Sequence, residues 1–437
     1  MNWEVRPSSL RGTLRIPPSK SHTIRAVLIA SLADGVSTVR RPLAHGDGRS
    51  ALEAARGLGA EVRVRDNGEE WEIRGTGGAR GRAGGGVLDC GNSGTSARLF
   101  CAAAALGAGK WRFDGDRSLR TRPMRPLLDA LTELGASYTL HQSNADIPFT
   151  ISGPLVGGAC RVDGISSQFV SSLLLSCPTV SNDTVVEVYN LHERPYVELT
   201  CRWLDKMDIS YECSTDLTHF RIHGRQRYRP IRETVPADFS SSLFPAVAAA
   251  ITGSTLTLEG LDFSDPQGDK QVFRFLEMMG AEVEREGRRV TVSGTSGLRG
   301  TTLDLNETPD ALPVLAVLGC AAEGTTHLVN VAQARFKETD RISVMCAELS
   351  RMGARISEEP DGLVIHHSRL RGTTVDGRED HRVVMALAVA GLIAEGATTV
   401  TTAEAADVTY PGFVDDFVSV GAHMTPMDAG STPRAED

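Results

Sequence analysis

One phrase that recurs six times constrains the fold of this 437-residue chain more than any other feature of its sequence. Each copy is an amphipathic run typical of a helix, then an apolar residue and Gly-Ala, then a short alternating run typical of a strand. The third copy is degenerate, with Asp208-Ile209 in place of Gly-Ala. The copies occupy residues 51–64, 127–140, 198–212, 272–285, 344–358 and 413–425.

The glycines of these phrases recur about 70 residues apart, which suits a supersecondary unit of helices and strands and is too long for a solenoid repeat. Glycine at this point fits a helix C-cap that needs a left-handed backbone. We therefore predict an α/β protein of six units, each a helix–strand–helix–strand–strand succession, divided three and three. Chance recurrence of a phrase common in α/β proteins is the alternative, and the regular spacing argues against it. The positions are Gly59, Gly135, Gly280, Gly353 and Gly421, with Asp208 in the third copy.

Two Pro-rich, polar segments interrupt the periodic runs and mark where the chain crosses between domains. They lie at residues 16–21 and 227–241. We expect one domain of residues 19–232, holding units one to three. The other domain combines residues 1–18 with 233–437 and holds units four to six. A chain of this length suits two or three domains of about 100 to 200 residues.

Composition excludes several classes of function. No stretch approaches the roughly 18 apolar residues of a membrane helix, and the first residues lack the apolar core of a signal peptide, so a cytoplasmic protein is expected. The eight cysteines lack metal-ligand spacing, and we predict reduced thiols, no metal and no cofactor. A formal net charge of -9 argues against nucleic-acid binding. Any anion site must therefore be built locally.

Three segments of the first half place cations and small polar residues where helices are predicted to begin. Lys20, Ser21 and Arg25 follow Pro17-Pro18, at or near a helix N-terminus that can bind an anion. Residues 90–98 are small enough for backbone N–H groups to approach a ligand. The loop 114–123 holds three arginines in six positions, suited to bidentate binding of carboxylate or phosphate. Helix capping or a solvated loop would explain each segment alone.

The second half repeats this arrangement. Asp310 precedes an apolar helical run, and residues 337–341 place two cations around two carboxylates at the start of another. Arg382 opens a further helix, where the helix dipole repels a cation unless an anion lies between them. In the first half, Ser166, Ser167 and Gln168 supply uncharged donors. Several helix N-termini of an acidic protein thus indicate a pair of anionic substrates.

These motifs resemble, in order and along nearly the whole chain, the family of 3-phosphoshikimate 1-carboxyvinyltransferase, or EPSP synthase. The family implies a two-domain inside-out α/β barrel in which each domain has three repeated βαβαββ-type units. It also implies enolpyruvyl transfer from phosphoenolpyruvate to a phosphorylated acceptor, without cofactor, by a protein expected to be a monomer. The motifs are PSKSxxxR, GNSGTxxR, RxRPM, SSQF, KETDR and DHR, as this chain carries them.

The resemblance also implies roles for single residues. Lys20, Asp310 and Glu338 would be catalytic, with the two carboxylates sharing the proton transfers in an order that the sequence leaves open. The residues implied to hold phosphoenolpyruvate are Lys20, Asn92, Gly94, Thr95, Arg122, Gln168, Arg341 and Arg382. The residues implied to hold the acceptor are Ser21, Arg25, Ser166, Ser167, Gln168, Tyr196, Asp310 and Lys337.

The chain departs from the family pattern at three positions, and the two on the acceptor side, Glu193 and Gln333, leave the acceptor open. Glu193 stands where a serine would bind the shikimate phosphate, Gln333 stands at an asparagine position, and Val408 stands where many members have a lysine. Shikimate 3-phosphate is the first expectation. Another phosphorylated acceptor is the alternative, such as the UMP used by paralogues in nucleoside antibiotic biosynthesis. An inactive binding homologue is a third hypothesis, which the intact acid–base carboxylates disfavour.

Overall fold

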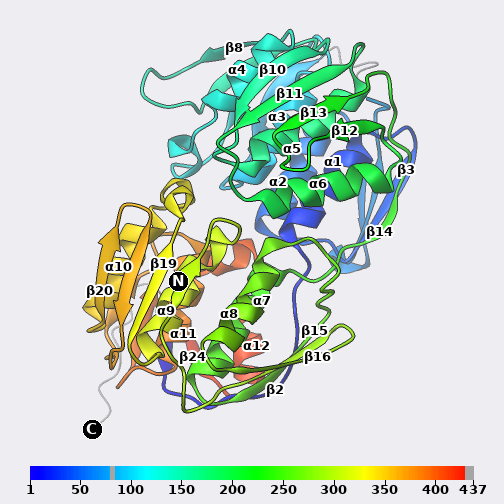
Figure 1. The fold of residues 1–437 in the computed structure, drawn as a ribbon. Helices are drawn as coiled ribbons and strands as arrows, with labels where there is room; N and C mark the ends of the chain where they lie inside the picture. Colours follow the sequence, from blue (N-terminus) through cyan, green and yellow to red (C-terminus); the bar gives the residue numbers. More distant parts are fainter. Residues whose placement is uncertain (79–83, 429–437) are drawn as a thin grey trace. The chain divides into compact units, whose positions relative to one another are not determined.

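A computed structural model of the chain describes residues 1–78 and 84–428, in two compact units (Figure 1). Unit 1 comprises Met1–Pro17, Ala237–Phe263 and Asp269–Asp437, and unit 2 comprises Pro18–Pro236 and Ser264–Gly268. Crossings were expected after residues 18 and 232. The structure has four crossings, and the additional pair encloses Ser264–Gly268.

Unit 2 contains three four-stranded sheets. The first has the order β14-β3-β5-β4, the second β6-β7-β9-β8 and the third β10-β11-β13-β12. The strands are β3 (Val36–Arg40), β4 (Glu61–Arg65), β5 (Glu70–Arg74), β6 (Gly85–Asp89), β7 (Lys110–Asp114), β8 (Ser137–Leu140), β9 (Phe149–Ser152), β10 (Gly158–Asp163), β11 (Thr184–Tyr189), β12 (Tyr211–Cys213), β13 (His219–Ile222) and β14 (Arg232–Thr234).

Unit 1 also contains three four-stranded sheets, with the orders β16-β17-β15-β2, β18-β19-β21-β20 and β22-β23-β1-β24. Their strands are β1 (Asn2–Arg6), β2 (Arg11–Arg15), β15 (Thr255–Glu259), β16 (Glu282–Glu286), β17 (Arg289–Ser293), β18 (Thr302–Asp304), β19 (Thr325–Val329), β20 (Arg355–Glu359), β21 (Gly362–His366), β22 (Thr374–Asp376), β23 (Thr398–Thr401) and β24 (His423–Met427).

Each sheet belongs to one βαβαββ repeat. In the third repeat, β10 and β11 are parallel, with Val162 opposite Val188, and α5 (Ser167–Ser176) connects them. Helix α6 (Arg194–Lys206) then leads to the antiparallel strands β12 and β13. Three repeats borrow a strand from a distant part of the chain: β14 completes the first sheet, β2 the fourth and β1 the sixth. The predicted repeat is therefore confirmed, with its ends closed by tertiary pairing.

The first helix of each repeat lies inside its unit. These helices are α1 (Lys20–Leu32), α3 (Gly94–Ala104), α5 (Ser167–Ser176), α7 (Phe239–Ile251), α9 (Leu312–Ala321) and α11 (His381–Gly391), and nearly all of their residues are buried. The second helices are α2 (Gly46–Gly57), α4 (Arg125–Glu133), α6 (Arg194–Lys206), α8 (Gln271–Met278), α10 (Arg341–Arg351) and α12 (Phe413–Ser419), and most bury one face.

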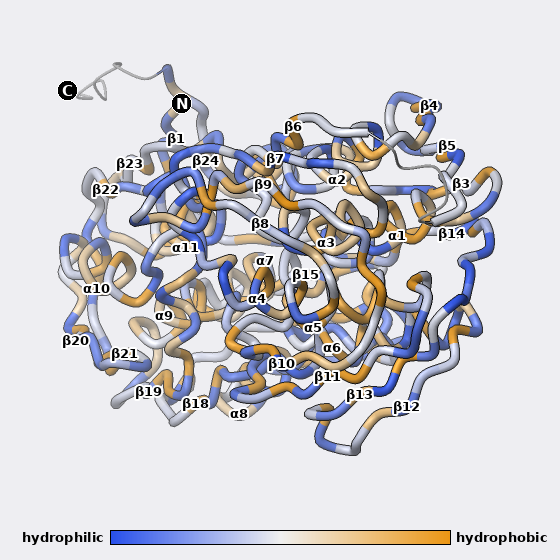
Figure 2. Tube along the Cα trace, turned by 90° about the horizontal axis from the view of Figure 1, so that it is seen from above, coloured by the Kyte–Doolittle hydropathy of each residue, from blue (hydrophilic) through white to orange (hydrophobic). Residues whose placement is uncertain are grey.

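The helices thus form the centre of each unit and the sheets its outside, which is the inside-out α/β barrel that the resemblance implies. Figure 2 shows hydrophobic colour along helices such as α1 and α3, whereas strands such as β13 and β20 carry both hydrophilic and hydrophobic colour. Each unit has its own apolar core. Within the described ranges no helix exceeds 13 residues, and none has the length and apolar character needed to cross a membrane.

The recurring glycines adopt the backbone that the phrase predicts. Gly59 has φ 95° and Gly280 has φ 101°, and Asp208 of the degenerate copy adopts φ 54°. A left-handed residue ends the helix and turns the chain into the next strand. Glycine reaches this conformation without the steric penalty that a side chain brings.

Candidate active site

The inner helices of unit 2 begin with the residues predicted to bind substrate. Lys20 and Ser21 open α1, Gly94 and Thr95 open α3, and Ser167 and Gln168 open α5. The first backbone N–H groups of a helix have no partner within it, and they carry the positive end of the helix dipole. Three helix starts in one unit therefore offer N–H donors to anions.

Gln168 connects two of these helix starts. Its Nε2 donates to Thr95 Oγ1 over 3.0 Å, and its Oε1 accepts from Arg98 Nη1 over 2.9 Å. Arg98 also donates to the carbonyl of Pro123 and lies over the ring of Phe169. Its place in this network was not predicted, although the GNSGTxxR motif contains it.

Arg122 lies beside Asn92 and Gly94. Its Nη2 donates to Asn92 Oδ1 over 2.8 Å and to Ser118 Oγ over 3.0 Å. A Cβ atom at position 94 would lie 3.0 Å from Arg122 Nη1, so the glycine allows this close approach. Asn92, Gly94 and Arg122 therefore come together as the sequence predicts.

Lys20 is held by a carboxylate that was not predicted. Its Nζ lies 3.4 Å from Asp47 Oδ2, and both side chains are mostly buried. Asp47 lies in the first turn of α2, where its own carbonyl accepts from Ser96 Oγ of α3. Asp47 therefore neutralises a cation at a helix N-terminus, where the helix dipole would otherwise repel it.

Arg25 is fully engaged with protein groups. Its Nε donates to Thr200 Oγ1, Nη1 to the carbonyl of Ser21, and Nη2 to Ser171 Oγ and the carbonyl of Tyr196. Burial lowers the pKa of Arg25 to about 10. Its role as an acceptor ligand stays a prediction. The geometry shows a guanidinium that fixes Ser21 and Tyr196, two other residues predicted to bind the acceptor.

Glu193 points toward the serine pair that opens α5. Ser167 Oγ donates to Glu193 Oε2 over 2.8 Å, while Ser166 caps α5 by accepting from Gln168 N. Glu193 is only 3% exposed and has a left-handed backbone with φ 55°. A carboxylate thus occupies the neighbourhood of Ser167.

Arg341 is the centre of a second group of predicted residues, in unit 1. Its Nη1 donates to Asp310 Oδ1 over 2.8 Å, its Nη2 to Glu338 Oε2 over 2.7 Å, and its Nε to Asp380 Oδ2 over 2.8 Å. Lys337 Nζ lies 4.0 Å from Asp310 Oδ1. Burial acts to lower the pKa of Arg341, but the three carboxylates raise it above its ordinary value.

Arg382 has donors that remain available. It is fully buried at the start of α11, with Nη2 3.5 Å from Asp310 Oδ2 and its guanidinium over the ring of Phe244. Among the residues that the structure describes, its Nε and Nη1 have no hydrogen-bond partner. Because a buried donor without a partner is costly, these atoms indicate an anion site.

Asp269 is a further carboxylate beside this group that the sequence did not single out. It is buried, and Ser240 Oγ donates to it. Burial, and then the charge of Asp310, raise the pKa of Asp269 to about 6.

The raised pKa of Asp269 predicts a pH-dependent effect of Asp269→Asn. The folded protein binds this proton more tightly than the unfolded chain does, so ionisation of Asp269 costs stability as pH rises from about 4 through about 6. The melting temperature of the variant, relative to the unmodified chain, is therefore expected to increase across that range. Calorimetry of both proteins from pH 4.5 to 8 measures this difference, and a constant difference would contradict it.

The two other departures lie in unit 1. Gln333 is buried, and its Nε2 donates to the carbonyl of Asn306 over 2.9 Å. Its Oε1 finds no partner among the described residues, so it remains available as an acceptor. Val408 ends a short 3-10 helix, Ala403–Val408, and no structural feature explains its substitution for lysine.

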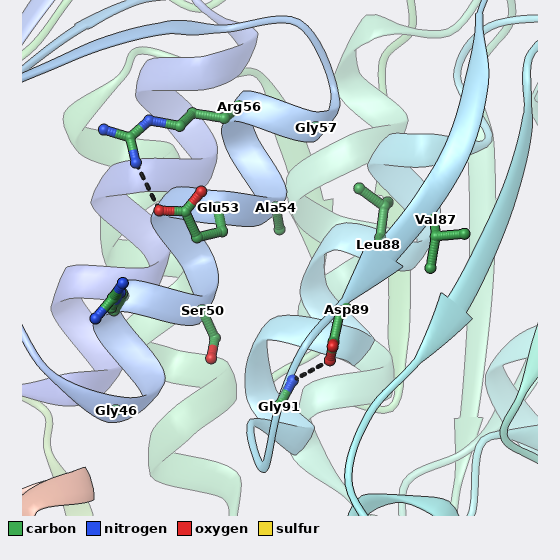
Figure 3. A pocket seen from close by; sticks show the side chains of 11 residues that line it. Gly46, Ser50, Glu53, Ala54, Arg56, Gly57, Val87, Leu88, Asp89 and Gly91 are labelled. Atoms are coloured by element: carbon green, nitrogen blue, oxygen red, sulfur yellow. Dashed lines mark hydrogen bonds and ion pairs between the residues drawn. The ribbon is translucent and has the colours of Figure 1, made fainter.

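A separate hollow of about 710 Å³ lies between α2 and β6 (Figure 3). Arg56 donates to Glu53 there, and Gly91 N donates to Asp89. The lining residues lie outside the predicted set, and we assign no ligand to this hollow. Among the described residues, no group of His, Cys, Asp and Glu has an arrangement that could hold a metal ion.

Solved structures place this fold in one class. EPSP synthase from Acinetobacter baumannii superposes with a TM-score of 0.78 and 25% identity, covering 97% of this chain and 100% of that one. The enolpyruvyl transferase NikO from Streptomyces tendae has the same fold, with a TM-score of 0.78 and 19% identity, covering 97% and 98% of the two chains. Fold and site together define an enolpyruvyl transferase.

The family model of EPSP synthase (3-phosphoshikimate 1-carboxyvinyltransferase) matches residues 5–417. A relative from Acetivibrio thermocellus with that enzyme name is 49% identical over 97% of this chain and 99% of its own. One from Methanocella arvoryzae is 44% identical over 96% and 99%. The chain belongs to the EPSP synthase family and is a carboxyvinyltransferase.

Proposed function

We propose that this enzyme transfers the carboxyvinyl group of phosphoenolpyruvate to a hydroxyl of shikimate 3-phosphate, giving 5-enolpyruvylshikimate 3-phosphate and phosphate. The observation that carries this proposal is the similarity to relatives named 3-phosphoshikimate 1-carboxyvinyltransferase over nearly their whole length. The cytoplasmic location and the monomeric state expected from the sequence stay predictions. Light scattering of the purified chain would test the second.

Cations bind phosphoenolpyruvate in this proposal. Arg382 uses its available buried donors, together with Arg341, for the anion in unit 1. In unit 2, the proposed phosphoenolpyruvate ligands are Lys20, Arg122 and Gln168, with Asn92, Gly94 and Thr95 beside Arg122 and Gln168. Buried charge-assisted hydrogen bonds hold a leaving phosphate more strongly than solvated ones.

Two of the three carboxylates on Arg341, those of Asp310 and Glu338, transfer protons. The acceptor hydroxyl oxygen attacks C2 of phosphoenolpyruvate while its proton passes to one carboxylate and C3 takes a proton, which gives a tetrahedral ketal. The C2–O bond to phosphate then breaks, phosphate leaves with the electron pair, and C3 returns its proton. We assign to Asp310 the proton of the acceptor hydroxyl, because Asp310 lies beside Lys337, a predicted acceptor ligand. We assign to Glu338 the proton transfer at C3.

Phosphate release from phosphoenolpyruvate tests the proposed acceptor, with shikimate 3-phosphate and UMP offered separately and the products weighed by mass spectrometry. Release with shikimate 3-phosphate and a product of the expected mass supports the proposal. Release with UMP alone would move the chain to the alternative acceptor class, which the acceptor-side departures Glu193 and Gln333 favour. Absence of release with either acceptor would favour an inactive binding homologue or an acceptor outside both classes.

Glu193 is expected to weaken binding of a phosphorylated acceptor. Two charges at 4 Å repel by roughly 1 to 4 kcal/mol between water and a protein surface. We expect Glu193→Gln to lower KM for shikimate 3-phosphate about tenfold with little change in kcat, because about 1.4 kcal/mol corresponds to a factor of ten. Steady-state kinetics at pH 8 measures both constants.

Glu198→Gln is the matched control, since Glu198 lies on the exposed side of the same helix and contacts Arg194. It should leave KM unchanged. A higher KM in Glu193→Gln would contradict this expectation. It would mean that Glu193 orients Ser167 for acceptor binding and does not repel the acceptor phosphate.

A further inference from the structure

The first turn of α1 is anchored by His22, the residue after Ser21. His22 is 7% exposed and lies between Trp203 of α6 and Asp265. Trp203 Nε1 donates to His22 Nδ1 over 3.2 Å. His22 Nε2 lies 2.9 Å from Asp265 Oδ2, an ion-pair distance whose direction does not give a hydrogen bond. An indole N–H can only donate, so Nδ1 is the accepting nitrogen and the proton of the neutral ring lies on Nε2, the nitrogen nearest Asp265.

Asp265 belongs to the short segment Ser264–Gly268, which is part of unit 2 although the chain on either side belongs to unit 1. Gln267 N donates to Asp265 Oδ1 over 3.1 Å, and Ser19 Oγ donates to Gln267 Oε1 over 3.3 Å. Burial acts to raise the pKa of Asp265, but its contacts with His22 and Gln267 hold it below the ordinary value. A charged carboxylate thus lies within ion-pair distance of His22 Nε2.

The cap of α1 is weak without these contacts. Ser19 Oγ accepts from His22 N at 3.5 Å, the limit of a hydrogen bond, and gives its own proton to Gln267. Lys20 occupies the first helical position, where the helix dipole opposes a cation. Ser19 N donates to Pro236 O and Ser19 O accepts from Thr23 N, and side chains outside α1 add to this backbone anchorage of the turn that carries Lys20.

We propose that His22 and Asp265 are positioning residues that hold the first turn of α1, and with it Lys20, in the geometry for phosphoenolpyruvate. This inference rests on the proposed function, which gives Lys20 its role. A segment far along the chain thereby determines where the lysine amine stands. A displacement of about 1 Å at a reacting group costs on the order of a hundredfold in rate.

Two substitutions of His22 separate the two contacts. Glutamine reaches as far as Nε2 and can donate to Asp265, whereas asparagine reaches only to the place of Nδ1 and can accept from Trp203. We expect His22→Gln to stay within about threefold of the unmodified kcat/KM for phosphoenolpyruvate, and His22→Asn to lose about 10- to 100-fold. Asp265→Ala also removes the contact from Gln267 N, so it should lose at least as much as His22→Asn. The double variant should lose no more than Asp265→Ala, because both single changes remove the His22–Asp265 contact.

The rate of amide hydrogen exchange in residues 19–28 reports on the His22–Asp265 contact and does not require catalytic turnover. Faster exchange in His22→Asn and Asp265→Ala, with His22→Gln close to the unmodified protein, is expected. Equal activity losses in His22→Gln and His22→Asn, or additive losses in the double variant, would overturn the inference. If His22→Asn does not fold, Asp265→Ala carries the comparison. An unmodified enzyme without turnover would instead contradict the proposed function, and the exchange result would still decide whether His22 and Asp265 hold the turn.

Discussion

Replacing Glu338 by glutamine is expected to lower kcat by about 10²- to 10⁴-fold, the range of a lost general acid or base. The glutamine has nearly the same shape, and its Oε1 can still accept from Arg341 Nη2, so the fold and the neighbouring contacts should persist. What the amide lacks is the ability to exchange a proton with C3 of phosphoenolpyruvate. Phosphate release under saturating substrates measures kcat, and circular dichroism checks the fold.

Glu358→Gln is the control for this loss. Glu358 accepts hydrogen bonds from Arg335 and Ser343 and does not contact Arg341. Glu358→Gln therefore removes one negative charge, as Glu338→Gln does, but outside the Arg341 group. We expect little change in kcat. Turnover of Glu338→Gln close to that of the unmodified enzyme would remove Glu338 from the proton transfers.

Replacing Arg341 by glutamine is expected to destabilise the protein as well as inactivate it. Three carboxylates, Asp310, Glu338 and Asp380, donate no hydrogen bond when ionised and share this one buried guanidinium. Removing one partner of a buried ion pair typically lowers the free energy of unfolding by about 3 to 5 kcal/mol, because the remaining charge is left uncompensated. Urea unfolding at pH 7.5 measures that free energy, and kcat/KM for phosphoenolpyruvate should fall in parallel.

Arg351→Gln serves as the control from the last turn of the same helix. Arg351 is 53% exposed and lies 3.5 Å from Glu348, which is buried and keeps Asp376 N and Arg378 as partners. An exposed cation in such a pair contributes about 0 to 1 kcal/mol to the free energy of unfolding. The free energy of unfolding of Arg351→Gln should be nearly that of the unmodified protein. The prediction would be contradicted if Arg341→Gln had the same free energy of unfolding as Arg351→Gln. The three carboxylates would then rearrange or take up protons without loss of stability.

The repeat could be predicted from sequence because its signals are local. A helix period, a left-handed cap and a strand period each depend on residues within one or two turns. The exchange of β1, β2 and β14 between distant parts of the chain could not be predicted in this way, since a strand pairs according to the edge that the folded unit leaves open. The short excursion at Ser264–Gly268 has no local signal of its own.

In the candidate site, too, the features with local signals could be predicted and the long-range contacts could not. The helix starts at Lys20, Gly94 and Gln168 were recognisable from capping residues, small residues and the motifs of the family. Their partners Asp47 and Arg98 were not assigned. Asp380 lay within a recognised motif, yet its bond to Arg341 links residues 39 positions apart, and no periodicity marks such a pair.

By itself the sequence determined six helix-and-strand repeats, the chemical character of each helix start and the family of the reaction. These depend on short-range backbone preferences and on motifs that can be read along the chain. Only the tertiary structure decided that Arg341 joins carboxylates from positions 310, 338 and 380, that Glu193 faces Ser167, and that Asp265 meets His22. Ion pairing and burial depend on how helices from separate repeats pack, and that packing places charges together in a low-dielectric interior where their interactions become strong.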